Sequence, residues 1–310
     1  MSSSSDGLMS SSSSALVTVG MPLYNAERYL DEAVKSVLRQ SFDGFQLVMS
    51  DNASTDGTLE RCHYWAKRDA RIVVLESESN RGAAWNYNRT VEAATGKYFR
   101  WQAHDDRCEP DMLRQLVECF ARDPSIVLAF AFTRLIDADG NEIRQLNDKL
   151  GIDSDRAAER YRMMVRNLRD CNAVFGLIDR SVLLTTKMIG PYSSSDRALL
   201  YELALRGRFA EVPDHLFERR RHLNSSLRAS KSRKDLATWF DTGARRGLAF
   251  PGLRLLRRHA QNLQSAPLTT RERSECAFVL ATEWPIAYAR ATRQRWRREW
   301  RARRNQKVAL

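Results

Sequence analysis

Short apolar runs alternate along the first half of the chain with stretches whose apolar residues recur every three or four positions. The runs predict buried strands at residues 16–19, 45–49, 72–75, 98–102 and 126–132. The periodic stretches predict amphipathic helices, the first of which buries Leu30, Ala33, Val34, Val37 and Leu38. Strands that alternate with helices form a mostly parallel sheet with helices on its faces, so we expect an α/β fold.

Glycine and proline residues mark where these elements are expected to begin or end. Gly20 and Pro22 are expected to end the first strand, and Gly96 to close a helix over residues 83–94. Pro110 suits the first turn of the helix that precedes the fifth strand.

The composition divides the chain into three segments. Residues 1–14 are rich in serine and cannot bury an apolar core, so we expect a disordered tail. Residues 15–230 carry the strand and helix pattern and are expected to form the main α/β domain. Residues 231–310 lack the strand pattern and are expected to form a basic helical C-terminal extension.

The positive charge of the chain is concentrated in this extension. The formal net charge is +12, of which residues 1–230 contribute −1 and residues 231–310 contribute +13. Trp296 and Trp300 share a helix face amid arginines, which favours peripheral contact with an anionic membrane. No nucleic-acid partner is expected, because apart from these two tryptophans the extension does not interleave aromatic with basic residues. The alternative is a helical cap whose arginines are only solvated.

The cysteines, the apolar runs and the N-terminus argue against several classes of protein. The five cysteines form no Cys-x-x-Cys pair, so neither a zinc site nor a disulfide framework is predicted. No apolar run approaches the roughly 18–20 residues that span a bilayer. The first residues lack the basic and apolar regions of a secretion signal. We therefore expect a cytoplasmic protein. If the basic helices bind lipid, the protein would lie at the inner face of the membrane.

Polar residues directly follow three of the predicted strands. They are Pro22, Tyr24 and Asn25 after the first, Asp51 after the second, and Asp105 and Asp106 after the fourth. Ligands of parallel sheets bind at the carboxyl ends of the strands, so these residues are expected to meet in one crevice. An adjacent carboxylate pair can bind Mg²⁺ or Mn²⁺ together with phosphate oxygens. The alternatives are a solvated acidic loop for the pair and a turn or capping aspartate for Asp51.

Six short segments follow one another in a specific order. They are Val17–Asn25, Ser36–Gln40, Ser50–Thr58, Asn80–Gly82, Ala94–Tyr98 and His104–Asp106. Their order and spacing resemble those of the family 2 glycosyltransferases, which have the GT-A fold, and the resemblance covers about residues 16–227. It implies an enzyme that takes a nucleotide-diphospho-sugar as its donor.

The resemblance implies a donor-binding role for residues after the first three strands. Residues that would surround the nucleobase or diphosphate are Pro22, Tyr24, Asn25, Asp51, Asn80 and Arg81. Among them, Asp51 would accept the N3–H of the base, typically uracil. On its own, Tyr24 would more often be a packing residue, since tyrosines at strand ends usually are.

The resemblance also implies a diphosphate and metal site. Asp105 would contact the ribose or sugar, and Asp106 would hold the divalent metal, Mn²⁺ or Mg²⁺. His104 stands where the family's acidic triplet usually begins. Further along, the Arg220-x-His222 segment resembles the basic segment that closes over the diphosphate, so Arg220 would bind the donor and His222 would add a metal contact.

One aspartate in the second half is the candidate general base. Asp196 precedes a leucine-rich helix, and by itself it reads as an N-cap residue. Inverting members of the family place a carboxylate base at this helix start, although Ser195 stands where they often have a glutamate.

These roles together imply one reaction. The resemblance implies transfer of a sugar, with inversion, from a nucleotide-diphospho-sugar (a UDP-sugar is expected) to a hydroxyl of a glycan or lipid-linked acceptor. The competing hypothesis is a nucleic-acid-binding or membrane-binding protein that acts through the basic C-terminal helices. A nucleotidyltransferase is not favoured, because residues 20–25 are not a glycine-rich phosphate loop.

Overall fold

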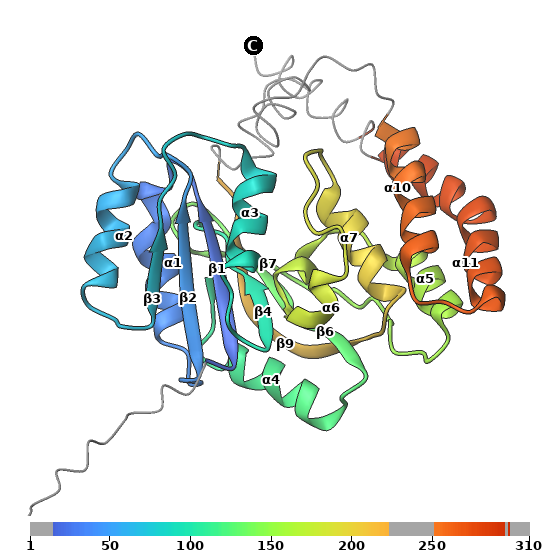
Figure 1. Ribbon diagram of the computed structural model, residues 1–310, viewed down its shortest axis with the longest axis horizontal. Helices are drawn as coiled ribbons and strands as arrows, with labels where there is room; N and C mark the ends of the chain where they lie inside the picture. The colour runs from blue at the N-terminus through green and yellow to red at the C-terminus, as the bar shows by residue number, and fades with distance from the viewer. Residues whose placement is uncertain (1–14, 223–250, 295–296, 298–310) are drawn as a thin grey trace, which may run out of the picture.

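A sheet of nine strands runs through the part of the chain that the computed structural model describes, residues 15–222, 251–294 and 297 (Figure 1). The strands are β1 (Val17–Leu23), β2 (Phe45–Asp51), β3 (Ile72–Leu75), β4 (Tyr98–Trp101), β5 (Arg107–Cys108), β6 (Ile126–Ile136), β7 (Glu142–Leu146), β8 (Leu177–Asp179) and β9 (Arg208–Arg220). Three of the sequence predictions lie outside the described residues: the tail at 1–14, the boundary after residue 230, and the pair Trp296 and Trp300.

The strand order is β3-β2-β1-β4-β8-β6-β9-β5, with β7 paired to β6. β1 is parallel to β2 and β4, β2 is parallel to β3, and β6 is parallel to β9. β5, β7 and β8 run antiparallel to their neighbours. The predicted α/β fold with a mostly parallel sheet is therefore confirmed. The sequence pattern did not indicate β5, β7, β8 and β9, of which β8 lies antiparallel between β4 and β6.

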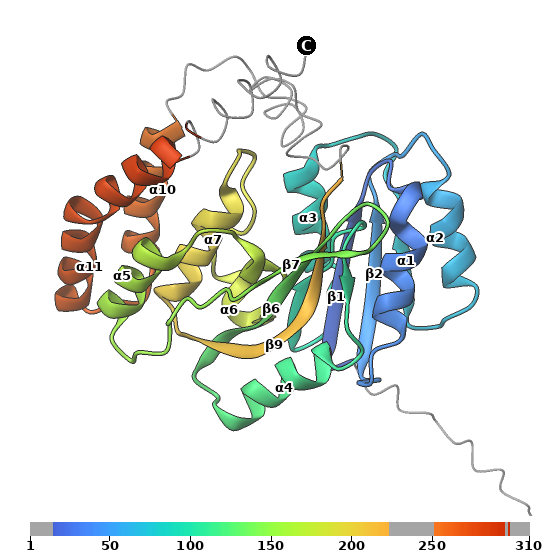
Figure 2. The same cartoon turned by 180° about the vertical axis from the view of Figure 1, so that it is seen from behind.

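Helices cover both faces of the sheet (Figures 1 and 2). One apolar cluster lies under α1 (Glu27–Leu38), α2 (Thr58–Ala66) and α4 (Met112–Arg122). The other lies under α3 (Ala83–Glu92), α5 (Ala157–Asn167), the 3-10 helix η1 (Asn172–Phe175), α6 (Arg180–Leu184) and α7 (Ser195–Ala204). Central strands are thus buried on both faces, which explains their continuous apolar runs.

The first strand continues past both residues that were expected to end it. Gly20 and Pro22 lie inside β1, which pairs with β2 as far as Leu23. The carbonyl of Gly20 accepts from Gln102 N on the β4 side. Backbone groups alternate sides along a strand, so the nitrogen of Pro22 also faces the β4 side, where pairing has already ended. No ladder hydrogen bond is lost, and proline is tolerated there.

Gly20 also lets α3 lie close to the sheet. A Cβ atom at Gly20 would lie 2.5 Å from Thr90 Oγ1 and 2.6 Å from Phe99 Cζ. Any side chain would therefore push α3 outward. This close approach matters because α3 carries residues that border the candidate active site.

The expected C-terminal helices are present where the structure describes them. α10 (Pro251–Ser265) packs on α7, and α11 (Thr270–Thr282) packs on α5 (Figure 1). Arg258 Nε donates to the hydroxyl of Tyr192 at 2.9 Å, and Asn262 Nδ2 donates to Ala198 O at 3.2 Å. This part of the extension therefore braces the start of α7. Within the described residues, no helix combines the length and apolarity needed to cross a membrane.

A neutral histidine lies at the centre of this helical contact. His259 of α10 is 1% exposed, and its Nδ1 lies 3.1 Å from the hydroxyl of Tyr161. Tyr201 and Trp284 also contact its ring. Burial, with a smaller contribution from the charge of Arg197, lowers the pKa of His259 to about 3. The folded protein therefore holds this imidazole uncharged at neutral pH.

We expect this histidine to make stability depend on pH. Because its pKa is lowered by folding, His259 takes up a proton below about pH 6.5 in the unfolded chain but not in the folded chain. The contribution of His259 to stability is therefore complete above that pH and is lost progressively below it. Between pH 7 and pH 5, the free energy of unfolding of wild type should therefore fall by roughly 2 kcal/mol more than that of His259→Gln. Urea unfolding at both pH values measures this, with the exposed His63→Gln as the control. Equal losses in wild type and His259→Gln would contradict the assignment.

Candidate active site

The carboxyl end of β2 presents a buried carboxylate with one unused oxygen. Asp51 is the last residue of β2 and is 1% exposed. Its Oδ2 accepts from Ser54 N at 3.1 Å, whereas its Oδ1 has no hydrogen-bond partner among the described residues. A buried acceptor without a partner is costly unless a ligand supplies the donor. The N-cap alternative does not apply, since α2 begins after Gly57.

The loop after β1 lies beside Asp51. Tyr24 is 40% exposed and follows Leu23, the register partner of Asp51. Asn25 adopts a positive φ of 50°, and its Oδ1 accepts from Thr55 N at 2.8 Å. Asn25 thus ties together the loops after β1 and β2, while the Tyr24 ring stays available for stacking. Pro22 is buried within β1 and supplies backbone below this ring.

Asn52 joins a third loop to this end of the sheet. Its Nδ2 donates to Asn80 Oδ1 at 3.0 Å, and its Oδ1 accepts from Arg81 N at 3.0 Å. Asn80 Oδ1 also accepts from Gly82 N at 2.9 Å, at the start of α3. The Arg81 guanidinium is exposed and stacks 4.2 Å from the ring of Trp85. No sequence motif indicated a role for Asn52, although this residue directly follows Asp51.

The turn between β4 and β5 carries the acidic pair. Asp106 is 4% exposed, and its Oδ1 accepts from the backbone N–H of Arg220 at 2.8 Å. Its other carboxylate oxygen accepts no hydrogen bond from the described residues. Asp105 Oδ2 lies 2.8 Å from Nε2 of His222. From below, Gln102 Nε2 donates to Asp106 O at 2.8 Å and fixes the turn.

The surroundings of Asp105 and Asp106 shift the pKa values of their carboxyl groups in opposite directions. Burial and the neighbouring charge of Asp105 raise the pKa of Asp106 well above its usual value. Burial acts in the same direction on Asp105, but the hydrogen bond with His222 and the charges of His104 and His222 lower the pKa of Asp105 below its usual value. A cation beside Asp106 would favour its ionised form.

Arg220 lies under this turn. Its guanidinium has no exposed surface. Its Nε donates to Asp105 O at 2.9 Å, Nη1 to Ala138 O at 3.0 Å, and Nη2 to Glu32 Oε2 at 2.6 Å. Every nitrogen of the side chain is already bonded within the fold, and the contact of Arg220 with a diphosphate stays a prediction. Its observed role is to hold the acidic turn.

Asp196 lies at the N-terminal end of α7. Ser194, with φ of 70°, occupies the N-cap position, so Asp196 is the second residue of the helix and not its cap. Its Oδ1 accepts from Arg197 N at 2.8 Å. The side chain borders Cys171, the residue before η1, where burial and the charge of Asp196 raise the pKa of the thiol. A helix N-terminus favours a negative carboxylate at this place.

Tyr87 lies within electrostatic reach of both acidic centres. It lies on α3, and burial together with the charges of Asp105, Asp106 and Asp196 raises the pKa of its phenol. All three carboxylates therefore lie within electrostatic reach of one hydroxyl. No local pattern indicated Tyr87, because its place depends on the packing of α3 against the sheet, where Trp101 Nε1 donates to Tyr87 O at 3.1 Å.

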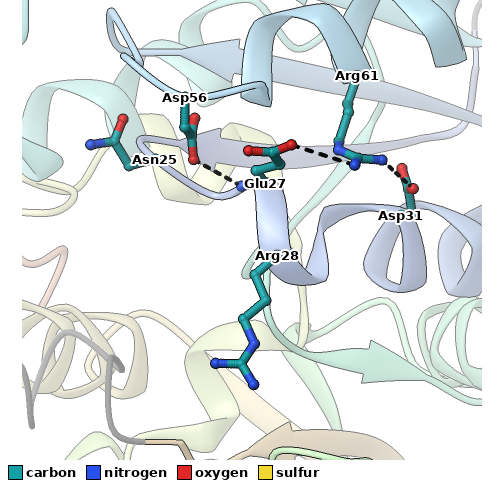
Figure 3. A pocket seen from close by; sticks show the side chains of 6 residues that line it. All are labelled: Asn25, Glu27, Arg28, Asp31, Asp56 and Arg61. Atoms are coloured by element: carbon teal, nitrogen blue, oxygen red, sulfur yellow. Dashed lines mark hydrogen bonds and ion pairs between the residues drawn. The ribbon is translucent and has the colours of Figure 1, made fainter.

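A hollow of about 360 Å³ lies at the start of α1 (Figure 3). It is lined by Asn25, Glu27, Arg28, Asp31, Asp56 and Arg61. Arg61 pairs with Glu27 and Asp31, and Arg28 points away from these groups (Figure 3). Only Asn25 of the predicted site residues lines this hollow.

The order of the strand-end residues and the sequence of the chain together identify the family. The model of "Glycosyl transferase family 2" matches residues 18–185. The chain belongs to glycosyl transferase family 2. The "Putative teichuronic acid biosynthesis glycosyltransferase TuaG" of Bacillus subtilis is 30% identical over 225 residues, which cover 73% of this chain and 86% of that protein. The chondroitin synthase of Escherichia coli is 25% identical over 68% of this chain and 32% of its own length.

Solved structures share the fold of this family 2 glycosyltransferase. TarS residues 1–349 of S. aureus, in complex with UDP, match with a TM-score of 0.60 and 17% identity over 85% of this chain and 70% of that chain. The mannosyltransferase PcManGT of Pyrobaculum calidifontis, in complex with GDP-Man and Mn²⁺, matches with a TM-score of 0.53 and 18% identity over 94% of this chain and 83% of that chain. These matches support the GT-A fold.

Proposed function

We propose that this glycosyltransferase moves a sugar, with inversion, from a nucleoside-diphospho-sugar to an acceptor hydroxyl. The carrying observation is the arrangement of carboxylates: Asp106, in the turn after β4, keeps one oxygen unbonded among the described residues, and Asp196 lies at the start of α7. One acidic centre suits the donor diphosphate, and the other suits an incoming hydroxyl. The UDP, UDP-GlcNAc and GDP-Man complexes of the fold neighbours support a nucleotide-sugar donor.

In this proposal the nucleobase lies at the ends of β1 and β2. Tyr24 stacks on the base, and Asp51 Oδ1, which has no partner among the described residues, accepts a base N–H. The loop of Asn80 and Arg81, fixed by Asn52, closes the same end. Uracil, with its N3–H, meets this requirement, so UDP is the expected nucleotide.

The acidic turn fits a divalent cation bound together with the diphosphate. The described residues hold no group of three or more side chains suited to a metal ion. Mg²⁺ and Mn²⁺ need only one or two protein carboxylates when phosphate oxygens complete the ligand set. Asp106 offers one unbonded oxygen and a raised pKa that a cation would relieve. Such a cation would stabilise the charge of the leaving diphosphate, and His222 is proposed to act beside Asp105.

The chemistry proposed for Asp196 is removal of a proton. Its carboxylate accepts the proton of the acceptor hydroxyl as that oxygen attacks the anomeric carbon opposite the diphosphate. The α7 N-terminus keeps the base oriented through Arg197 N. Inversion follows because the base and the leaving group lie on opposite sides of the sugar.

The acceptor is proposed to be a growing polysaccharide or a lipid-linked glycan. The names of the relatives point to polysaccharide synthesis. α10 and α11 pack against the fold and thus act in part as a cap. Arg290, Arg293 and Arg297 remain exposed beyond them. Contact of these arginines with the inner face of a membrane, and a cytoplasmic location, stay predictions.

Calorimetric titration with UDP, GDP and dTDP, each with and without Mn²⁺, tests the proposal. We expect one nucleotide to bind, more tightly with Mn²⁺. Asp51→Ala should weaken that binding at least about tenfold, because it removes a charged hydrogen-bond acceptor. The exposed Asp43→Ala is the control and should bind as wild type does. Absence of binding by all three nucleotides would refute the donor assignment.

A further inference from the structure

Helix α10 carries positive charge that no carboxylate of the described residues neutralises. Its charged side chains are Arg254, Arg257 and Arg258, and it contains no aspartate or glutamate. None of the three forms an ion pair with a residue that the structure describes. Glu202 of α7 lies within electrostatic reach of Arg258, but it is 2% exposed and pairs with another arginine at 3.0 Å. On α11, by contrast, Glu275 pairs with two arginines.

Two of the α10 arginines lie over the ring of Tyr192. The guanidinium carbons of Arg254 and Arg258 are 5.8 and 5.5 Å from the centre of this ring, which is within the range of a cation–π contact. Arg258 Nε donates to the Tyr192 hydroxyl at 2.9 Å. Its Nη1 and Nη2, and every nitrogen of the Arg254 side chain, donate no hydrogen bond to a described residue. The buried tyrosine thus orients two guanidiniums whose outer edges are open to an anion.

Tyr192 belongs to the segment that leads into α7, residues 185–194. Within it, Ile189 N donates to Asn88 Oδ1 of α3 at 3.1 Å, and Ile189 O accepts from Asn88 Nδ2 at 2.9 Å. Tyr192 O accepts from the N–H of Ser195, the residue before the candidate base, at 3.3 Å. The segment therefore joins α3, α7 and α10, and the two arginines border the end of α7 that carries the base (Figure 1).

The two arginines occupy a different face of α10 from its most exposed side chains. Leu253 is 63% exposed, and Arg257, four residues on, is also exposed. Residues four apart share a helix face, so Arg254 and Arg258 share the face that meets Tyr192. A flat membrane surface would meet the outward face first. The inner pair suits a ligand that enters beside α7.

The carboxylates of the proposed site would repel an acceptor that is itself negative. They belong to Asp105, Asp106 and Asp196, and like charges repel strongly where water is partly excluded. Guanidiniums on the acceptor side offset this repulsion for an anionic acceptor, whereas a neutral acceptor gains no charge interaction from them. The edge of a guanidinium also matches the paired oxygens of a carboxylate or a phosphate.

We propose that Arg254 and Arg258 bind an anionic group of the acceptor, a carboxylate or a phosphate. This inference rests on the proposed function and adds a chemical class to its acceptor, a glycan that carries negative charge near the accepting hydroxyl. It makes α10 a part of the substrate-binding site as well as a cap on α7.

The test compares initial rates with the acceptor found by screening and with the same acceptor after neutralisation, of a carboxylate by reduction or of a phosphate by enzymatic removal. With the anionic acceptor, Arg258→Gln should raise the KM about tenfold, the usual effect of losing a charged hydrogen bond. Arg254→Gln should raise it about threefold, because this side chain is more exposed. Nucleotide affinity and the turnover number should stay within about twofold of wild type. With the neutralised acceptor, wild type should show the raised KM and the substitutions should add little.

Three further variants separate binding of an anion from a structural effect. Arg257→Gln, on the outward face of the same helix, is the matched control and should keep the wild-type KM. Arg258→Lys should restore part of the loss, because it keeps the charge but not the planar fork. Tyr192→Phe removes the hydrogen bond to Arg258 but keeps both guanidiniums, so it should raise the KM less than Arg258→Gln does.

Several outcomes would overturn the inference. One is a screened acceptor without a negative group, and another is a wild-type KM in both Arg254→Gln and Arg258→Gln. Weaker binding of these variants to phosphatidylglycerol vesicles, with an unchanged KM, would assign the arginines to a membrane surface instead. Failure of the proposed function differs from all of these, because wild-type protein would then bind no nucleotide and transfer no sugar. Thermal unfolding of each variant verifies that the fold is retained.

Discussion

Asp196→Asn should lower the turnover number roughly 10²–10⁴-fold, the usual contribution of a general base, while donor affinity stays within about twofold of wild type. Asparagine has the same shape, and its Oδ1 can still accept from Arg197 N. It cannot accept the proton of an acceptor hydroxyl. The loss should therefore fall on the chemical step, since the substitution removes an interaction needed in the transition state.

The measurement is the initial rate with the donor identified by titration and an acceptor found by screening. The exposed Asp214→Asn on β9 is the matched control and should keep full activity. Turnover of Asp196→Asn within about threefold of wild type would contradict its role as the base. A parallel loss of nucleotide affinity would instead indicate damage to the donor site.

The sequence was most informative at the strand ends. Asp51, Asp105 and Asp106 each follow an apolar run, and polar residues at the carboxyl ends of parallel strands face the ligand in this class of sheet. Their proximity follows from topology, so local pattern was sufficient. The antiparallel β8 was missed because three residues are too few to show a strand period, and its neighbours β4 and β6 precede it by far in the chain.

The surroundings of adjacent arginines could not be predicted from sequence. Neighbouring residues of a strand point to opposite faces, so Arg219 and Arg220 have different partners. Arg220 bonds to Glu32 of α1 and Arg219 to Asn172 of η1, both distant in sequence. For the same reason Tyr87, placed by the packing of α3 against the sheet, gave no local signal.

Asp106→Asn should abolish the effect of Mn²⁺ on nucleotide binding. In wild type we expect Mn²⁺ to raise affinity at least about tenfold, because a carboxylate and phosphate oxygens share the cation. Asparagine can still accept from Arg220 N through its Oδ1, so the turn should persist. Metal-free affinity should therefore stay close to that of wild type. The control is the exposed Asp43→Asn.

The pH dependence gives this prediction a second readout. Burial and the charge of Asp105 raise the pKa of Asp106, so protons compete with the metal as pH falls through that raised value. The effect of Mn²⁺ in wild type should fade with acidification and be absent at every pH in Asp106→Asn. Because the pKa of Asp106 is raised by folding, this carboxyl makes the metal-free fold less stable at neutral pH, so the variant should melt at a higher temperature than wild type without metal. A variant that keeps the effect of Mn²⁺ would place the metal elsewhere.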